Sequence, residues 1–355
     1  MKDILADSVG ILVANATKTE QQGHPTAESL QAARRTGAFA LGDPVTAAGA
    51  TEIAGALTGL GRGCASTAWI AGTCFTSKFM AAGVAHLDET AASRIFADPD
   101  ALFCGSGRPG GTGTRGPEGV RLTGRWPIVS GCEDAEWAGL AVVVDGTPSY
   151  VMIPMTDLGI EHTWDTAGMR GTGSHTVVAE DVLVPADQVG TFSGPPGPAA
   201  MLMFSLAVLA PVVGATLGAL DVIDAMFASD RKPFMTEYAR MADSPGARHW
   251  LADATARTGR AERSMLAVAA EADARAEMSA TDLSRLRLNL FESARDCRAA
   301  LELMLDLHGA SGFSVGNPLQ RLWRDVAVGS RHPLLNGYLA TENYGYALTG
   351  GRRIA

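Results

Sequence analysis

From about residue 98 to residue 190 the sequence is a succession of short segments rich in Val, Ile, Thr and Trp, separated by Gly, Pro and Asp. No helical pattern lies between them. Strands at this spacing indicate a small antiparallel barrel or sandwich, because a parallel βαβ sheet requires crossover helices. The segments are ALFCGSG, GVRLTGRWPIV, WAGLAVVVDG, SYVMIPM, IEHTW and HTVVAEDVLVP.

Both flanks of this region are predicted to be helical. Residues 1–97 contain Ala-rich segments with apolar residues at spacings of three and four. After the linker TFSGPPGPAA, the same spacing indicates an amphipathic helix of a bundle. Its apolar positions are Leu283, Leu286, Leu290, Ala294, Cys297, Leu301, Met304 and His308. The sequence therefore predicts an N-terminal helical domain (1–97), a middle β-domain (98–190) and a C-terminal helical bundle (191–355).

One stretch is long enough to cross a membrane. The 22 residues from Ala199 to Leu220 carry no charge. Pro211 and the small residues Gly214 and Gly218 interrupt the run, and no basic cluster flanks it to set an orientation. We therefore favour a helix buried inside a bundle.

Composition and charge narrow the function classes. The net charge is -9 and the pI about 5.3, which argues against a nucleic-acid binder. The five cysteines are odd in number and far apart, so a disulfide framework and a thiolate metal site are not predicted. The N-terminus lacks the pattern of a signal peptide, which together with the cysteines indicates a cytoplasmic protein. The seven histidines are scattered without HExxH, so no metal is predicted.

The segment GSGRPG (105–110) matches the dinucleotide fingerprint GxGxxG but not its context. The fingerprint must open a helix, whereas more Gly and then another strand follow here. A hairpin loop is the preferred interpretation. No Gly-Lys-Ser/Thr follows, and no GxSxG hydrolase elbow occurs.

A set of motifs, in the same order and over nearly the whole chain, resembles the acyl-CoA dehydrogenase superfamily. More narrowly, the motifs are similar to its flavin-dependent monooxygenase branch, often called group D. Members of that branch hydroxylate phenols and aromatic polyketides, or oxidise sulfur or amino-sugar nitrogen. The motifs are GCASTAWIAG (63–72), LTGRWPIVSGCEDAEWA (122–138), WDTAGMRGTGSHTVVAEDVLVP (164–185), LDLHGASGF (305–313) and LQRLWRDVAVGSRHPLL (319–335).

The resemblance implies an α+β fold with an N-terminal α-domain, a middle β-barrel and a C-terminal four-helix bundle, assembled as a homotetramer with flavin at a subunit interface. It implies a monooxygenase that uses reduced FAD or FMN and O2, through a flavin C(4a)-hydroperoxide, on a small aromatic, polyketide-like or amine substrate. An NAD(P)H:flavin reductase would supply the reduced flavin, which fits the lack of a dinucleotide motif.

Several residues match family segments that contact flavin. Next to the ring these are Cys104, Gly105, Ser106 and Trp126; Arg231 and Phe234 match the R-x-x-F motif that reaches the phosphates in a neighbouring subunit; Gly309 and Gly312 match the turn near the adenine or pyrophosphate. Each has a plainer alternative: a β-core aromatic for Trp126, a solvated helix-end arginine for Arg231, and a helix C-cap for the glycine turn.

The glutamate with which acyl-CoA dehydrogenases remove a proton is missing from both family positions. One position is nine residues after the Arg of the R-D pair, Arg324-Asp325, and here it is Pro333. The other lies in the helix after the β-domain, and residues 188–220 contain no acid. This departure disfavours dehydrogenation and leaves the fold intact.

The monooxygenase branch carries a serine and a histidine near these places, and this chain offers Ser130 and His332. A hydroxyl near flavin N5 can hold the N5 proton, and a histidine can relay a proton at neutral pH. The plainer alternatives are a turn serine and a helix-end histidine. Trp69, Phe79, Met80 and Arg170 are candidates for lining the substrate pocket, although each can equally be structural.

Two competing functions stay open from sequence. One is a dehydrogenase or oxidase of the same fold that acts on an acyl-CoA or carrier-bound acyl group with an unrecognised base. The other is a flavin-free binding protein built on this fold.

Overall fold

The protein is described by a computed structural model over residues 2–46, 48–85, 87–192, 194, 196–275 and 277–350. Two compact units make up the chain. The first, here the β-unit, comprises Met1–Gly49, Ser66–Thr166 and Arg170–Gly197. The second, the helical unit, comprises Ala50–Ala65, Ala167–Met169 and Pro198–Ala355.

The β-unit starts with helices, as the sequence predicts. These are α1 (Lys2–Gln22), α2 (Ala27–Arg35), α4 (Ala65–Phe79), which continues into a π-helical turn η1 (Met80–Val84), and α5 (Glu89–Ile95). The boundaries follow local chemistry. Thr26 caps α2 by accepting from the backbone N–H of Ser29, and Asp88 caps α5 in the same way through Thr90 and Ala91.

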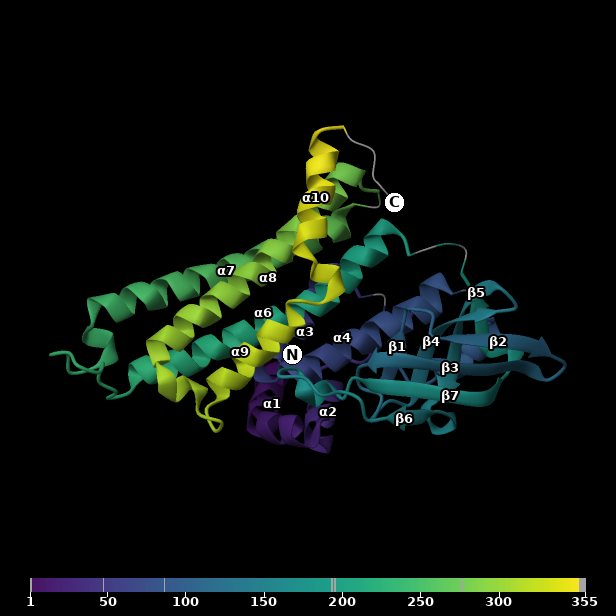
Figure 1. Cartoon of the computed structure of the whole chain (residues 1–355), viewed down its shortest axis with the longest axis horizontal. Helices are drawn as coiled ribbons and strands as arrows, with labels where there is room; N and C mark the ends of the chain where they lie inside the picture. The colour runs from purple at the N-terminus through teal and green to yellow at the C-terminus, as the bar shows by residue number, and fades with distance from the viewer. Residues whose placement is uncertain are drawn as a thin grey trace. The chain divides into compact units, whose positions relative to one another are not determined.

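The strands of the β-unit form one eight-stranded sheet (Figure 1). They are β1 (Phe103–Ser106), β2 (Gly111–Gly116), β3 (Gly119–Val129), β4 (Trp137–Val144), β5 (Thr147–Pro154), β6 (Gly159–Glu161), β7 (His175–Val184) and β8 (Val189–Thr191). The order is β6-β7-β3-β2-β4-β5-β8, with β1 on β4.

The sheet differs from the expected antiparallel one in two pairings. Strands β1 and β2 both run parallel to β4, so the sheet is mixed. The loop between β1 and β2 is therefore not the hairpin loop that the sequence suggested, because its two strands do not pair with each other. A hairpin does follow it, between β2 and β3.

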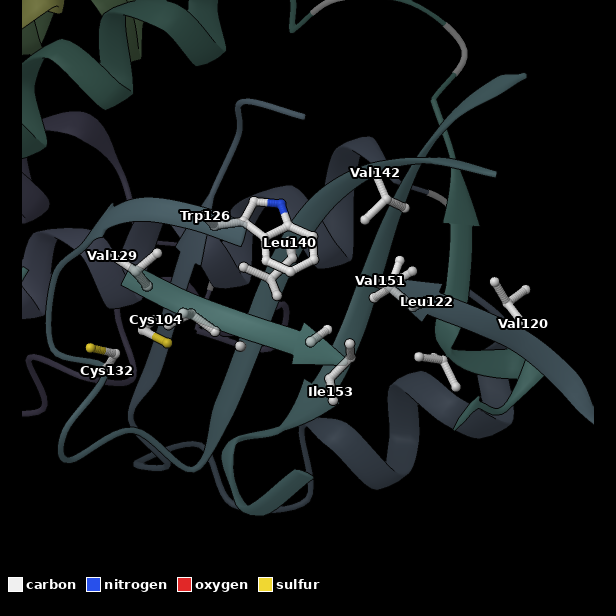
Figure 2. Packing of buried hydrophobic residues seen from close by; sticks show 14 of the residues in the cluster. Cys104, Val120, Leu122, Trp126, Val129, Cys132, Leu140, Val142, Val151 and Ile153 are labelled. Carbon is white, nitrogen blue, oxygen red and sulfur yellow. The ribbon is translucent and has the colours of Figure 1, made fainter. Parts of the chain in front are cut away.

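Trp126 lies at the centre of the β-unit core (Figure 2). Its side chain is fully buried, and its Nε1–H donates to the carbonyl of Ala141 at 2.8 Å. Three glycines make room for the indole: a Cβ at Gly110, Gly111 or Gly124 would lie 2.6–2.7 Å from a ring atom. The glycine-rich stretch that resembles a dinucleotide fingerprint thus serves the packing of Trp126.

The helical unit contains the remaining long helices. They are α3 (Ala50–Gly63), α6 (Pro198–Ala228), α7 (Pro245–Ala274), α8 (Ala280–His308), α9 (Pro318–Gly329) and α10 (Gly337–Leu348), with α7 and α8 side by side (Figure 1). The apolar stripe expected along 283–308 is confirmed, since every residue named for it is buried in α8.

Helix α6 contains the uncharged run and is the one helix in the described residues that is long and apolar enough to span a membrane. Of its most apolar window, 78% is buried within the protein, which supports the buried-helix interpretation. The small residues of the run let α6 approach α3 closely. A Cβ at Gly214 would lie 2.3 Å from the carbonyl O of Thr58, and one at Gly61 would lie 2.7 Å from that of Pro211.

This close approach predicts opposite effects for two Gly→Ala changes in the same helix pair. Gly214→Ala forces the backbones apart and should destabilise the protein by about 1–3 kcal/mol or more. Gly55→Ala, on the exposed side of α3 with nothing within 4 Å, should be neutral or stabilise by up to ~1 kcal/mol. Urea unfolding measures both, and equal effects would contradict the packing described.

Candidate active site

Strand β3 bulges immediately before Ser130. Its pairing with β7 slips between Trp126 and Val129, and within the slip Ile128 has a φ of 61°. A β-branched residue rarely adopts this left-handed conformation, because its side chain crowds the backbone. Ile128 is also exposed. Strained, exposed bulges of this kind are enriched at ligand sites.

Beyond the bulge, Ser130 ends a chain of three buried hydroxyls. Its Oγ lies 2.7 Å from the Oγ of Ser174, which in turn lies 2.6 Å from the Oγ1 of Thr172. The backbone joins the same two segments, because the N–H of Gly131 donates to the carbonyl of Thr172 at 2.8 Å. Gly131 has a φ of 79°, so a turn glycine directly follows the buried hydroxyl of Ser130. Sequence reasoning missed Ser174 and Thr172, although both lie in the quoted motif GMRGTGSHT.

The residues that follow Ser130 include two acidic side chains, and each of them contacts histidine. Glu133 contacts the Nε2 atoms of His162 and His175 at 2.7 and 3.5 Å, and Asp134 contacts the Nδ1 of His24 at 3.2 Å. Burial raises the pKa of Asp134, with the histidine acting in the opposite direction. Burial and the neighbouring His162 lower the pKa of His175. The three histidines therefore anchor the loop that follows Ser130.

Glu133, His162 and His175 offer donor atoms within 4.8 Å of one another, a set that a divalent cation can use. No sequence motif indicates this cluster, because its residues are far apart in the chain. One hydrogen bond opposes a metal: the Nδ1 of His175 accepts from the backbone N–H of Trp164 at 3.1 Å. The neutral ring then carries its proton on Nε2, the atom that a metal would need. We interpret the cluster as hydrogen-bonded.

The end of β1 supplies the segment Cys104–Ser106. Cys104 is buried, with its Sγ 3.6 Å from the Sδ of Met155. Gly105 has no room for a side chain, since a Cβ would lie 2.5 Å from the carbonyl O of Gly139. Ser106 is half-buried and bonds to the carbonyl of Arg108. Only backbone and a small hydroxyl are thus offered at this strand end.

Helix α4 has one partly open face. Trp69, Thr73, Thr76 and Phe79 are half-buried at spacings of four, three and three, whereas most of the helix is fully buried. Met80 is buried where the α-helix changes to the π-helical turn, a feature frequent at functional sites. The two aromatic candidates therefore share a face with two threonines that the sequence analysis did not single out.

Arg170 contacts its own loop. Its NH1 donates to the carbonyl of Thr166 at 3.1 Å and lies 3.5 Å from Asp165. A structural arginine makes such contacts, and the role of Arg170 in a substrate pocket stays a prediction. Likewise, the side chain of Trp126 is the core aromatic of the plainer alternative, so only its backbone neighbours are available to a ligand.

In the helical unit, Arg231 folds onto the C-terminus of α8. Its NH2 donates to the carbonyl of His308 at 2.5 Å and to the Oγ of Ser311 at 3.0 Å. Gly309 ends the helix with a φ of 70°, and Gly312 packs on the ring of His308. Guanidinium at a helix C-terminus is favourable electrostatically. The helix C-cap at Gly309 and the guanidinium of Arg231 therefore both lie at the turn that the family resemblance placed near the adenine or pyrophosphate of the flavin.

His332 begins a short 3-10 turn (Pro333–Leu335), and its Nδ1 accepts from the N–H of Leu334 at 3.3 Å. Burial lowers its pKa to about 4, so the ring is neutral at pH 7 with its proton on Nε2. The preceding R-D pair is occupied within the same unit. Arg324 donates to the carbonyl of Ala167, and Asp325 accepts from the N–H of Met169.

The chain is similar to known proteins over nearly its whole length. A family profile described as "Acyl-CoA dehydrogenase, C-terminal domain" matches residues 206–337. The chain is 30% identical to an FADH(2)-dependent resorcinol hydroxylase, oxygenase component, of Rhizobium sp. (strain MTP-10005), covering 95% of this chain and 91% of that protein. The family is decided by that match. This chain belongs to the flavin-dependent monooxygenase branch of the acyl-CoA dehydrogenase superfamily.

Further similarities agree with this assignment. The monooxygenase is 29% identical to the oxygenase subunit HsaA of Rhodococcus jostii (strain RHA1), covering 93% of each chain. The structure of XiaF from Streptomyces sp., in complex with FADH2 and glycerol, superposes with a TM-score of 0.89 at 26% identity, covering 99% of this chain and 96% of that one. The fold, the family and the use of reduced flavin predicted from the motifs are confirmed.

The residues of this monooxygenase suit a flavin chemically. The β-unit offers the hydroxyl of Ser130 and the side-chain-free backbone at Gly105, and the helical unit offers the guanidinium of Arg231 for a phosphate. Among the described residues, the two family positions of the dehydrogenase base offer no unpaired carboxylate: Pro333 lies in the short turn, and the first acid of α6 is Asp221, which is paired with Arg62. The individual site assignments stay predictions.

The neutral state of His332 predicts a pH effect on stability. Its pKa of about 4 in the folded protein lies below its usual 6.5. Between these values the unfolded chain binds one more proton, so the free energy of unfolding falls as the pH falls from 6.5 to 4. His332→Asn retains a capping oxygen and should make this decline shallower. The exposed His249→Asn on α7 is the control. Urea unfolding of the monooxygenase at pH 4–7 measures it, and parallel curves for wild type and His332→Asn would contradict the buried neutral ring.

Proposed function

We propose that this chain is the oxygenase component of a two-component system that hydroxylates a small aromatic compound, with reduced flavin supplied by a separate NAD(P)H:flavin reductase. The whole-length similarity to an oxygenase component named as a resorcinol hydroxylase carries this proposal. The names of HsaA of Rhodococcus jostii, described as an oxygenase subunit, and of an indole-3-acetate monooxygenase of Acinetobacter baumannii support it.

The chain's own residues support an aromatic substrate. The open face of α4 combines the rings of Trp69 and Phe79 with the hydroxyls of Thr73 and Thr76. Aromatic walls with a few placed hydroxyls favour a flat ring that carries oxygen substituents over a long acyl chain. The missing base at Pro333 and along α6 argues in the same direction.

Bound reduced flavin would supply the electrons that activate O2, and the transferred oxygen atom would come from O2. The protein's part is to place protons and to exclude water. We assign Ser130 to holding the proton on flavin N5, since its hydroxyl is buried and already part of a hydrogen-bond chain. We assign His332 to the substrate oxygen. Its Nδ1 accepts from the N–H of Leu334, and burial lowers its pKa to about 4, so the ring stays neutral at pH 7 with its proton on Nε2.

One set of assays tests the proposed function together with the roles of Ser130 and His332. Purified protein given chemically reduced FAD or FMN, O2 and a set of phenols should form hydroxylated product with little H2O2, whereas saturated acyl-CoAs should not bleach bound oxidised flavin. Ser130→Ala should still consume O2 but release mostly H2O2. His332→Asn keeps the cap and should slow product formation at least about a hundredfold, the lower end for a positioned acid–base group.

The outcomes separate the alternatives. Bleaching by an acyl-CoA would establish the dehydrogenase or oxidase function instead. No O2 consumption above that of free reduced flavin, with any substrate, would identify a flavin-free binding protein. Unchanged coupling of O2 use to product in both variants would return Ser130 and His332 to the roles of turn serine and capping histidine.

We also propose a homotetramer in which Arg231 and Phe234 of one subunit serve the flavin of another. The helical unit exposes Phe234 and Met235 on one segment and Phe313 and Val315 on another, and Arg231 joins the two segments by a hydrogen bond to Ser311. Such clustering is typical of a protein interface.

Light scattering at micromolar concentration should report the tetramer. Phe234→Asp should dissociate it and weaken flavin binding, because a charge at an interface core is costly. Val45→Asp, which replaces an exposed apolar residue of the β-unit, is the matched control and should do neither. A monomeric wild-type protein would disprove the assembly.

A further inference from the structure

A pocket of about 370 Å³ opens between α8 and α9 of the helical unit. Three arginines lie on it: Arg295 and Arg298 belong to α8, and Arg331 follows shortly after the end of α9. Arg298 and His308 are ten positions apart in α8, which is about 15 Å along the helix axis. The pocket is therefore separate from the turn that the resemblance placed near the adenine or pyrophosphate.

The charge of this pocket is opposite to that of the whole chain. The protein has a net charge of -9, whereas the pocket carries three guanidinium groups and one carboxylate, that of Glu302. Glu302 already accepts from the Nε1–H of Trp323 at 2.8 Å. Arg295 pairs with Glu292, outside the pocket lining, at 2.7 Å. Positive charge from the other two arginines therefore dominates the pocket.

Within the described residues, Arg298 and Arg331 contact neutral acceptors rather than carboxylates. NH1 of Arg298 donates to the carbonyl and the hydroxyl of Ser330 at 3.3 and 3.0 Å, and NH1 of Arg331 donates to the carbonyl of Ala327 at 2.5 Å. Burial lowers the pKa of Arg298, and the charges of Arg331 and Arg295 lower it further. A guanidinium has several N–H donors, so both arginines keep donors for an anion, which would also relieve the repulsion between them.

The rest of the lining is apolar and comes from both helices. It consists of Ala299, Leu301, Trp323, Val326 and Ala327. The indole of Trp323 is held in place by its bond to Glu302 and by Phe313, whose ring lies edge-on with the centroids 5.6 Å apart. The small side chains of the two alanines leave room between the helices. An aromatic wall beside placed charges suits a small molecule with a flat body and an anionic end.

We propose that this pocket is a second small-molecule site, which binds a flat aromatic carboxylate with its ring against Trp323 and its carboxylate on Arg298 and Arg331. A carboxylate matches a guanidinium because it accepts a pair of parallel N–H bonds. The volume of the pocket is in the range of sites for small ligands. All of its residues belong to the helical unit, so the inference does not depend on the roles proposed for flavin, Ser130 or His332.

Isothermal titration calorimetry of the whole chain with 2-naphthoate tests the site, and the neutral 2-naphthamide serves as the control ligand. The carboxylate should bind, and the amide should bind at least about fivefold more weakly because it lacks the charge. Arg298→Gln and Arg331→Gln should each weaken the binding of 2-naphthoate by about fivefold to tenfold, between the effects of an exposed ion pair and a buried charged hydrogen bond. Ala299→Leu keeps every charge and should weaken it as much by filling the pocket. Arg263→Gln, on the exposed side of α7, is the matched control and should resemble wild type.

Three results would overturn the proposal. Binding of 2-naphthoate that Arg298→Gln, Arg331→Gln and Ala299→Leu all leave unchanged would place the ligand elsewhere, such as on the open face of α4. Inorganic phosphate that binds as tightly as 2-naphthoate, with Ala299→Leu lacking an effect, would identify a plain anion site. Competition by FMN for the same site would make the pocket part of the flavin site. Should Arg298→Gln not fold because it loses its bonds to Ser330, Arg331→Gln and Ala299→Leu carry the same test.

Discussion

The packing of one indole governs the part of the β-unit that matters for function. Trp126 is buried among three glycines, and its N–H is bonded to Ala141. Any side chain on those glycines would clash with the ring. The ring and the glycines together restrict how strand β3 can pack against its neighbours. The slip in pairing then falls just after Trp126. The bulge, the exposed Ile128 and the buried Ser130 come directly after this fixed ring in the chain.

The spacing and composition of residues along the chain predicted the local features of the structure, such as which face of a helix is buried. The spacing along 283–308 identified the buried face of α8, and the uncharged run was correctly interpreted as a buried helix because its glycines suit a helix crossing better than a lipid face. The parallel pairing of β1 and β2 with β4 could not be read from the segments, since strand composition does not encode partner direction. The role of Gly110 and Gly111 could not be predicted from the sequence either. These glycines make room for the ring of Trp126, which lies elsewhere in the chain.

The site shows the same division between resemblance and geometry. Motif matching pointed to Ser130, Arg231 and His332, and the structure gives each a local partner: Ser174, the end of α8, and the N–H of Leu334. A structural partner does not compete with a catalytic role here, because a group must be held before it can act with geometric precision. Ser174, Thr172 and the threonines of α4 were missed because only burial and distance distinguish them from other small polar residues.

The charge states of the candidate groups fit the chemistry assigned to them. Burial raises the pKa of Cys132 to about 12 and lowers that of His332 to about 4, so both are neutral at pH 7, as are the three hydroxyls. The acidic side chains next to Ser130 are Glu133 and Asp134, and histidines contact both of them. Oxygen transfer competes with loss of H2O2, which stray protons promote. Groups that donate hydrogen bonds without easily exchanging protons favour transfer, and the buried hydroxyls of Ser130, Ser174 and Thr172 are groups of this kind.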